Sequence, residues 1–259
     1  VEGFDTKVIG CNDYEPASGS DIVIVTAGIA RKPGMSRDDL LKTNANIVSS
    51  VSKEISRVAP DSIIIMVSNP LDVMAYVALQ ETGFERKRVI GMAGVLDTAR
   101  FRSFIALELG VSVEDIQALV LGGHGDTMVP LVSYTTVSGI PLTQFIGSQR
   151  LEKIIERTRT GGAEIVGHLK TGSAYYAPSA AAVQMAESIA KDKRRVLPCA
   201  AYLEGEFGYD GIFLGVPCIL GASGLEKIIE VELTQMESEA LAESVDSVKD
   251  TMRSLEAIR

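Results

Sequence analysis

Two short runs of mostly β-branched residues, 21–26 and 62–67, flank a segment with helical periodicity over 37–58. Continuous apolar runs of this length are typical of parallel strands that are buried on both faces of a sheet. Strand, helix and strand in this order predict a βαβ unit. A second helix is expected from about Asp72, and a strand over 88–92 continues the alternation. The N-terminal part therefore predicts a Rossmann-type, doubly wound parallel sheet in an α/β fold.

After residue 93 the pattern changes to hairpin-like strands, with glycine and proline between them, and to long helices. The strands are expected over 131–141 and 194–219, and the helices over 162–192 and 237–258. This mixture predicts a second, α+β domain. The expected division is residues 1–92 for the remainder of a dinucleotide-binding domain and residues 93–259 for a catalytic domain.

The length and composition of the chain exclude several classes of protein. At 259 residues the chain can bury a sizeable core, and no apolar run reaches the roughly 18 residues of a membrane span. The formal net charge of −9, without a dense basic run, argues against nucleic acid and anionic lipid as partners. The three cysteines show no C-x-x-C spacing, which fits the reduced cytosol. Because His168 has no histidine or thiol nearby, no metal site is expected.

His124 stands between glycines, in the sequence GGHGD, just after the strand-like run 116–121. Glycines allow a ligand to approach the backbone, and imidazole can give or take a proton near neutral pH. Upstream, Asp97 and Arg100 are three residues apart and would face the same way on a helix. The alternative for His124 is a structural or solvated histidine, and the alternative for Asp97 and Arg100 is a surface ion pair. Together the three residues predict a general acid/base, an orienting carboxylate and an anion-binding guanidinium.

Small and polar residues follow the first two predicted strands. Because the carboxyl ends of parallel strands lie at one edge of a sheet, ligands are expected to bind there, although such residues are also ordinary loop signals. The residues are Thr26, Ala27 and Gly28 after the first strand, and Val67, Ser68 and Asn69 after the second.

A Pro-Gly loop that carries Arg31 precedes the helix expected from Arg37. Ser36 could cap this helix, with Asp39 in the third helical position. The loop could serve as a lid, and the alternative is a solvated loop whose arginines keep it soluble. With Arg100, the two arginines would offer three guanidinium groups to an anionic substrate.

In its motifs, the chain resembles the malate dehydrogenases, in particular the bacterial branch that is most similar to the lactate dehydrogenases. The resemblance covers essentially the whole chain. The resemblance is specific because four segments match the family pattern in the same order and at similar spacing. These segments are residues 30–40, 67–72, 89–102 and 122–130.

The resemblance implies a role for each candidate residue. His124 would donate and accept the proton, and Asp97 would hold its imidazole. Arg100 would bind the C1 carboxylate of the substrate, Arg31 its distal carboxylate, and Arg37 would polarise the reacting carbonyl when the loop closes. Asn69 would touch both substrate and cofactor. The residues that would line the site of the cofactor NAD are Thr26, Ala27, Gly28, Asn44, Val67, Ser68 and Asn69.

The chain departs from the family pattern at its start. The family's glycine-rich phosphate turn and the acidic residue that binds the ribose should precede Val1, yet no G-x-G-x-x-G follows a predicted strand here. Roughly fifty residues of the family pattern are expected to be absent, judged from the length of a βαβ unit and its acidic position. Their absence is expected to expose the edge of the strand over 21–26.

Two other functions remain open at this point. The first is a lactate dehydrogenase or another 2-hydroxy-acid dehydrogenase. Arg31 argues against it, because a cation there needs a second substrate carboxylate, and the lactate enzymes carry a neutral side chain at that position. The second is a truncated domain that serves as a binding or assembly module, against which the intact catalytic set argues. The resemblance implies a homodimer or homotetramer, and the cytoplasm is the expected location.

Overall fold

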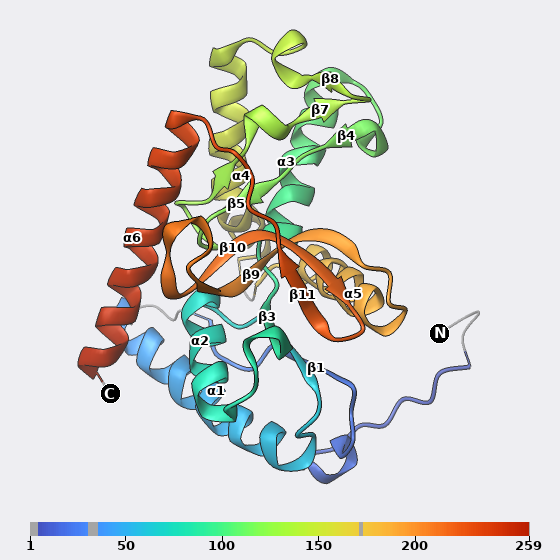
Figure 1. Cartoon of the computed structure of the whole chain (residues 1–259), viewed down its shortest axis with the longest axis vertical. Helices are drawn as coiled ribbons and strands as arrows, with labels where there is room; N and C mark the ends of the chain where they lie inside the picture. Colours follow the sequence, from blue (N-terminus) through green and yellow to red (C-terminus); the bar gives the residue numbers. More distant parts are fainter. Residues whose placement is uncertain (1–4, 31–35, 171–172, 259) are drawn as a thin grey trace.

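The computed structural model describes residues 5–30, 36–170 and 173–258, without the side chain of Arg37. Its centre is a six-stranded sheet in the order β1-β2-β3-β9-β10-β11 (Figure 1). The first three strands are parallel and the last three antiparallel. Their bounds are β1 (Ile22–Val25), β2 (Ile63–Met66), β3 (Val89–Gly91), β9 (Arg195–Glu204), β10 (Asp210–Gly221) and β11 (Gly224–Ile228). The expected α/β fold with a doubly wound parallel region is therefore confirmed.

The first two helices, α1 (Arg37–Val58) and α2 (Leu71–Thr82), connect these parallel strands. The predicted cap of α1 is present: the Ser36 hydroxyl accepts from the Asp39 N–H, and the Asp39 carboxylate accepts from the Ser36 N–H. This reciprocal pair satisfies two backbone donors that a helix start otherwise leaves free. The helix that carries Asn44 therefore begins at the residue expected from the sequence.

The sheet is covered by helices on both faces. Ile63 and Ile65 of β2 pack into the cluster that includes α5 (Tyr176–Ala190), whereas Ile64 and Met66 pack against α1 and α2. This alternation is the two-residue period of a strand. The expectation of burial on both faces holds for β2, but not for β1, where Ile24 is 41% exposed. Within the described residues β1 pairs with β2 alone, so it forms an edge of the sheet.

The remaining helices are α3 (Gly94–Leu109), α4 (Ser148–Leu169) and α6 (Gln235–Ile258), and Figure 1 shows α6 along one side of the molecule. The expected helical stretch 162–192 is wrong in two respects: its first helix, α4, begins earlier, at Ser148, and α5 is a separate helix. Gly161 and Gly162 lie inside α4, and Gly161 is one of its buried positions. Pro178 lies in the first turn of α5, where its missing N–H costs no helical hydrogen bond.

The strands expected over 194–219 form the β9–β10 hairpin, which β11 extends. β3 and β9 pair antiparallel at Gly91 and Ala200, so one sheet runs through both predicted domains. A Cβ atom on Gly91 would lie 2.7 Å from the Ala200 Cβ, so this close pairing needs glycine. The region 131–141 contains β7 (Thr136–Val137) and β8 (Ile140–Pro141), which join β4 (Ile116–Gln117) in a small sheet.

Two further short strands, β5 (Val120–Leu121) and β6 (Val129–Pro130), pair with each other. Single turns of 3-10 helix occur at Glu15–Ala17, Arg86–Arg88, Val113–Asp115, Val132–Tyr134, Leu142–Gln144 and Glu206–Gly208. In the described part of the chain, no helix is both long enough and apolar enough to span a membrane.

Candidate active site

His124 lies three residues beyond the end of β5, in the loop that leads to β6. The single strand expected over 116–121 is two strands, because β4 pairs with β7 whereas β5 pairs with β6. Gly122 then exchanges both backbone hydrogen bonds with Gly215 of β10, at 2.9 and 3.0 Å. A Cβ atom on Gly215 would lie 2.4 Å from the Gly122 carbonyl oxygen. The start of the histidine loop is thus fixed to the main sheet by a contact that only glycine permits.

The structure brings together the three residues that the sequence placed in one site. His124 Nδ1 lies 2.8 Å from Asp97 Oδ2, and Arg100 Nη1 lies 3.3 Å from Asp97 Oδ1. The Asp97 carboxylate, whose side chain is 2% exposed, therefore bridges the imidazole and the guanidinium. With a proton on Nδ1 directed to Asp97, Nε2 of the ring is the nitrogen left to exchange a proton with a substrate.

The electrostatics of the site favour the charged imidazole. Burial lowers the pKa of His124, but the charge and hydrogen bond of Asp97, together with the charge of Asp72, outweigh burial and raise that pKa above its ordinary value. Arg100 acts in the opposite direction and is the smallest of these influences. The result suits a group that must supply a proton near neutral pH.

Arg100 has spare capacity to bind an anion. Its side chain is 12% exposed, and its buried Nε–H has no hydrogen-bond partner among the described residues. Gly161 and Gly162 of α4 lie alongside, where a Cβ atom would be 3.3 Å from Arg100 Cδ and 3.6 Å from its Nη2 respectively. A buried guanidinium with a free donor matches the geometry of a carboxylate ligand.

The carboxyl ends of β1 and β2 are tied together by the side chains predicted there. The Ser68 hydroxyl donates to the Ala27 carbonyl at 2.5 Å. Asn44 Oδ1 accepts from the Ile29 N–H at 2.8 Å, and its Nδ2 donates to the carbonyls of Asn69 and Ile29 at 2.8 and 3.2 Å. Asn44 therefore holds the two strand ends in place through its amide.

These strand ends leave the backbone open to a ligand. Gly28 is exposed and has a φ of +149°, and a Cβ atom there would lie 3.1 Å from Asn44 Oδ1. The chain thus presents bare backbone and small side chains at the sheet edge where open α/β folds bind nucleotides. The other residues predicted for this site, Thr26 and Val67, flank the same edge.

The side chains of two residues predicted to bind substrate are not among those that the structure describes. Arg31 lies outside the described residues, and of Arg37 only the backbone, at the start of α1, is described. Their roles stay predictions from the sequence.

Two residues of the site were missed by the sequence analysis. Asp72 Oδ2 accepts from the backbone N–H of His124 at 2.9 Å, and Ser244 Oγ accepts from the backbone N–H of Gly123 at 2.8 Å. Asp72 could have been suspected, because it closely follows Asn69 at a strand end. Ser244 lies in α6, 121 residues from its partner, and no pattern in the sequence signals it.

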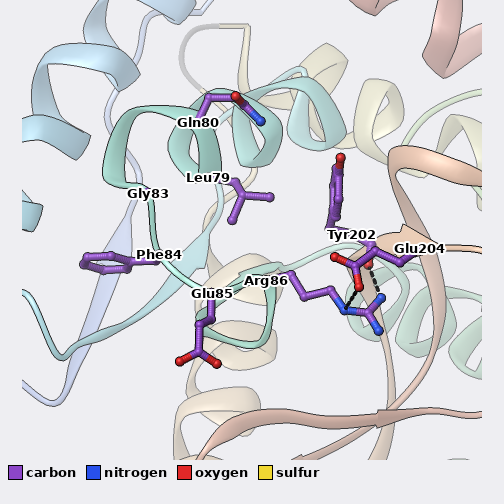
Figure 2. Close-up of a pocket in the computed structure, with 8 residues that line it drawn as sticks. All are labelled: Leu79, Gln80, Gly83, Phe84, Glu85, Arg86, Tyr202 and Glu204. Atoms are coloured by element: carbon purple, nitrogen blue, oxygen red, sulfur yellow. Dashed lines mark hydrogen bonds and ion pairs between the residues drawn. The ribbon is translucent and has the colours of Figure 1, made fainter.

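A separate hollow of about 390 Å³ lies beside the end of α2 and the strand β9 (Figure 2). Arg86, which lines it, is ion-paired with Glu204 and Glu206 and donates to the Tyr202 carbonyl. Its charge is therefore compensated, and the hollow shares no lining residue with the His124 cluster. The lining residues are Leu79, Gln80, Gly83, Phe84, Glu85, Arg86, Tyr202 and Glu204.

Comparison with protein-family models gives two matches that together cover nearly the whole chain. Residues 2–91 match the NAD binding domain of lactate/malate dehydrogenase, and residues 94–258 match the alpha/beta C-terminal domain of lactate/malate dehydrogenase.

Individual relatives agree with these matches. The chain is 57% identical to malate dehydrogenase of Roseiflexus sp. (strain RS-1), covering 100% of this chain and 84% of the relative. It is 59% identical to malate dehydrogenase of Geobacillus kaustophilus, covering 99% and 82%.

Solved structures give the same result. Malate dehydrogenase from Salinibacter ruber superposes with a TM-score of 0.95 at 55% identity, covering 99% of this chain and 82% of that one. Lactate dehydrogenase from Cryptosporidium parvum, complexed with lactic acid and nicotinamide adenine dinucleotide, superposes with a TM-score of 0.94 at 44% identity, covering 98% and 82%.

Proposed function

The chain belongs to the lactate/malate dehydrogenase family, and from this premise we propose that it catalyses the reversible oxidation of (S)-malate to oxaloacetate with NAD as cofactor. The observation that carries the proposal is the bridge that Asp97 makes between His124 and Arg100. It combines a proton-transferring imidazole with a cation for a substrate carboxylate.

The proton chemistry is assigned to His124. Oxidation of the malate hydroxyl removes a hydride from carbon and a proton from oxygen, and NAD, when bound, accepts the hydride. Neutral His124 takes the proton at Nε2 during oxidation, and the imidazolium returns it during reduction. Asp97 holds the ring by Nδ1 and stabilises the imidazolium that forms.

Three arginines are assigned to the substrate. Arg100 holds the carboxylate next to the reacting carbon, and Arg31 holds the distal carboxylate. Arg37 stabilises the negative charge that develops on the carbonyl oxygen during reduction, which is catalysis by a preorganised cation.

The nicotinamide end of NAD is assigned to the edge formed by β1 and β2. Asn69 contacts both substrate and cofactor at this edge. Residues 1–92 then serve nucleotide binding and residues 93–259 supply the proton and carboxylate chemistry, a division supported by the two family matches at 2–91 and 94–258. The full set of cofactor residues is Thr26, Ala27, Gly28, Asn44, Val67, Ser68 and Asn69.

A direct assay tests the proposed activity. The purified protein is expected to oxidise NADH when oxaloacetate is added, and to reduce NAD when (S)-malate is added, as followed by the absorbance of NADH. Pyruvate at the same concentration serves as the control for a lactate-type activity. Faster turnover of pyruvate than of oxaloacetate would assign the chain to lactate, and turnover of neither keto acid would leave the binding-module alternative.

The protein is further proposed to be a cytoplasmic homodimer or homotetramer. Tyr175, Tyr176 and Val183 of the α5 region are 59%, 81% and 60% exposed, and such a group of apolar side chains suits a protein contact. All three cysteines are free thiols, as the reduced cytosol maintains them. In gel filtration of a cytoplasmic extract, the activity is expected to elute at two or four times the subunit mass. Elution of the activity at the subunit mass would contradict the proposed oligomer. Activity confined to a cell fraction other than the cytoplasmic extract would contradict the proposed location.

A further inference from the structure

The backbone around His124 is held by three different elements. The N–H groups of Gly122, Gly123 and His124 donate, in sequence order, to the Gly215 carbonyl of β10, the Ser244 hydroxyl of α6 and the Asp72 carboxylate of α2. Three consecutive donors are thereby fixed from three directions. The acceptors differ in one respect: two are neutral and the third is an ionisable group.

Asp72 is an unusual choice for a backbone acceptor. The residue is 7% exposed, and its Oδ1 atom has no hydrogen-bond partner among the described residues. Burial of a carboxylate is unfavourable unless it is paired, whereas a hydroxyl such as that of Ser244 accepts an N–H at lower cost. The position of Asp72 in the first turn of α2 offsets part of this cost, because a helix N-terminus favours negative charge. The rest of the free-energy cost of burying this carboxylate indicates that its negative charge has a function in the site.

We propose that Asp72 is a second positioning carboxylate for His124, which fixes the histidine backbone by a hydrogen bond and stabilises the imidazolium by its negative charge. Asp97 fixes the ring from α3, and Asp72 fixes the main chain from α2, so the histidine lies between two carboxylates. The inference deepens the proposed function and rests on His124 as its acid/base. Asp72 touches neither substrate nor cofactor in this assignment.

The charges around the two groups agree with this arrangement. The groups that influence His124 are Asp97 and Arg100 of α3 and Asp72 of α2, while α6 contributes the neutral Ser244. Burial raises the pKa of Asp72 to about 6 and the charge of Asp97 acts in the same direction, whereas the hydrogen bond and charge of His124 act to lower it. A charged His124 therefore favours the ionised form of Asp72. Since the interaction of two charges is mutual, loss of the Asp72 charge must lower the pKa of His124.

The chain offers a direct test, because it has two histidines and His168 is exposed on α4. The imidazole of each can be titrated by NMR in protein with isotope-labelled histidine. Asp72→Asn keeps an oxygen for the His124 N–H and removes the charge. Ser244→Ala removes the neighbouring backbone acceptor without changing charge, and is the matched control.

Asp72→Asn is expected to move the titration of His124 to lower pH and to leave that of His168 in place, whereas Ser244→Ala moves neither. Asp72→Asn is also expected to lower kcat/KM for oxaloacetate reduction, and this loss should be about three- to tenfold larger at pH 8 than at pH 6. The reason is that reduction needs the imidazolium, which a lower pKa of His124 depletes first at high pH. An unchanged His124 titration in Asp72→Asn, or an equal shift in Ser244→Ala, would overturn the proposal.

A measurement on the unsubstituted protein serves where Asp72→Asn does not fold. If Asp72 and His124 interact, the carboxyl signal of Asp72 and the imidazole signal of His124 should each respond to the titration of the other group. Titration of His124 without any response of the Asp72 carboxyl signal would contradict the proposal. The titrations need no substrate, so they remain decisive for Asp72 even if the protein turns over neither malate nor oxaloacetate.

Discussion

The variant His124→Asn is expected to lower kcat for oxaloacetate reduction by about two to four orders of magnitude, which is the range that general acid–base catalysis contributes. Asparagine is close in size and keeps a hydrogen-bonding end toward Asp97, but it cannot exchange a proton. Folding and NADH binding should therefore persist. Stopped-flow turnover, with NADH binding measured separately by fluorescence, separates the two effects.

His168→Asn is the matched control, because it removes the other histidine from an exposed position on α4. It should leave turnover unchanged. Asp97→Asn should also slow turnover, since it removes the charge that supports the imidazolium. A rate for His124→Asn near that of the unsubstituted protein would remove the histidine from the proposed mechanism.

The sequence predicted a structural feature correctly where the residues that determine the feature lie close together in the chain. Helix α1 was placed correctly because its start is marked by Ser36 and Asp39, which lie within one turn of each other. The start of α4 was misplaced: the expected helix began at residue 162, whereas α4 begins at Ser148 and contains Gly161 and Gly162. There the buried face of α4, with Leu151 and Ile154 near its start, outweighs the poor helix propensity of glycine.

The active site shows the same division. The contact between Asp97 and Arg100 was predictable because it depends on helical spacing alone. The loop that carries His124 was predictable because glycines flank the histidine. The contacts of Asp72 and Ser244 with the histidine loop join residues 52 and 121 positions apart. Such contacts depend on how α2 and α6 pack on the sheet, which no local pattern encodes.

Substrate choice depends on Arg31, and its replacement is expected to have the other large effect. A guanidinium that pairs with the distal carboxylate of oxaloacetate contributes charge-assisted hydrogen bonds of about 1.5 to 3 kcal/mol. Pyruvate ends in a methyl group, so it forfeits these bonds and leaves the cation unpaired in a closed site. Preference for oxaloacetate over pyruvate should therefore approach about 10⁴ to 10⁵ in kcat/KM, as in sites whose polar groups lose their partner.

Arg31→Gln should abolish most of this preference, mainly by lowering kcat/KM for oxaloacetate, because the neutral amide cannot pair with the second carboxylate. Arg100→Gln should instead weaken both keto acids, since both carry the carboxylate assigned to Arg100. Arg253→Gln, at an exposed position of α6, controls for the loss of one positive charge. The measurement is kcat/KM for both substrates in the four proteins. If Arg31→Gln keeps the original ratio, Arg31 belongs to a solvated loop, and the choice of malate over lactate has to rest on another residue.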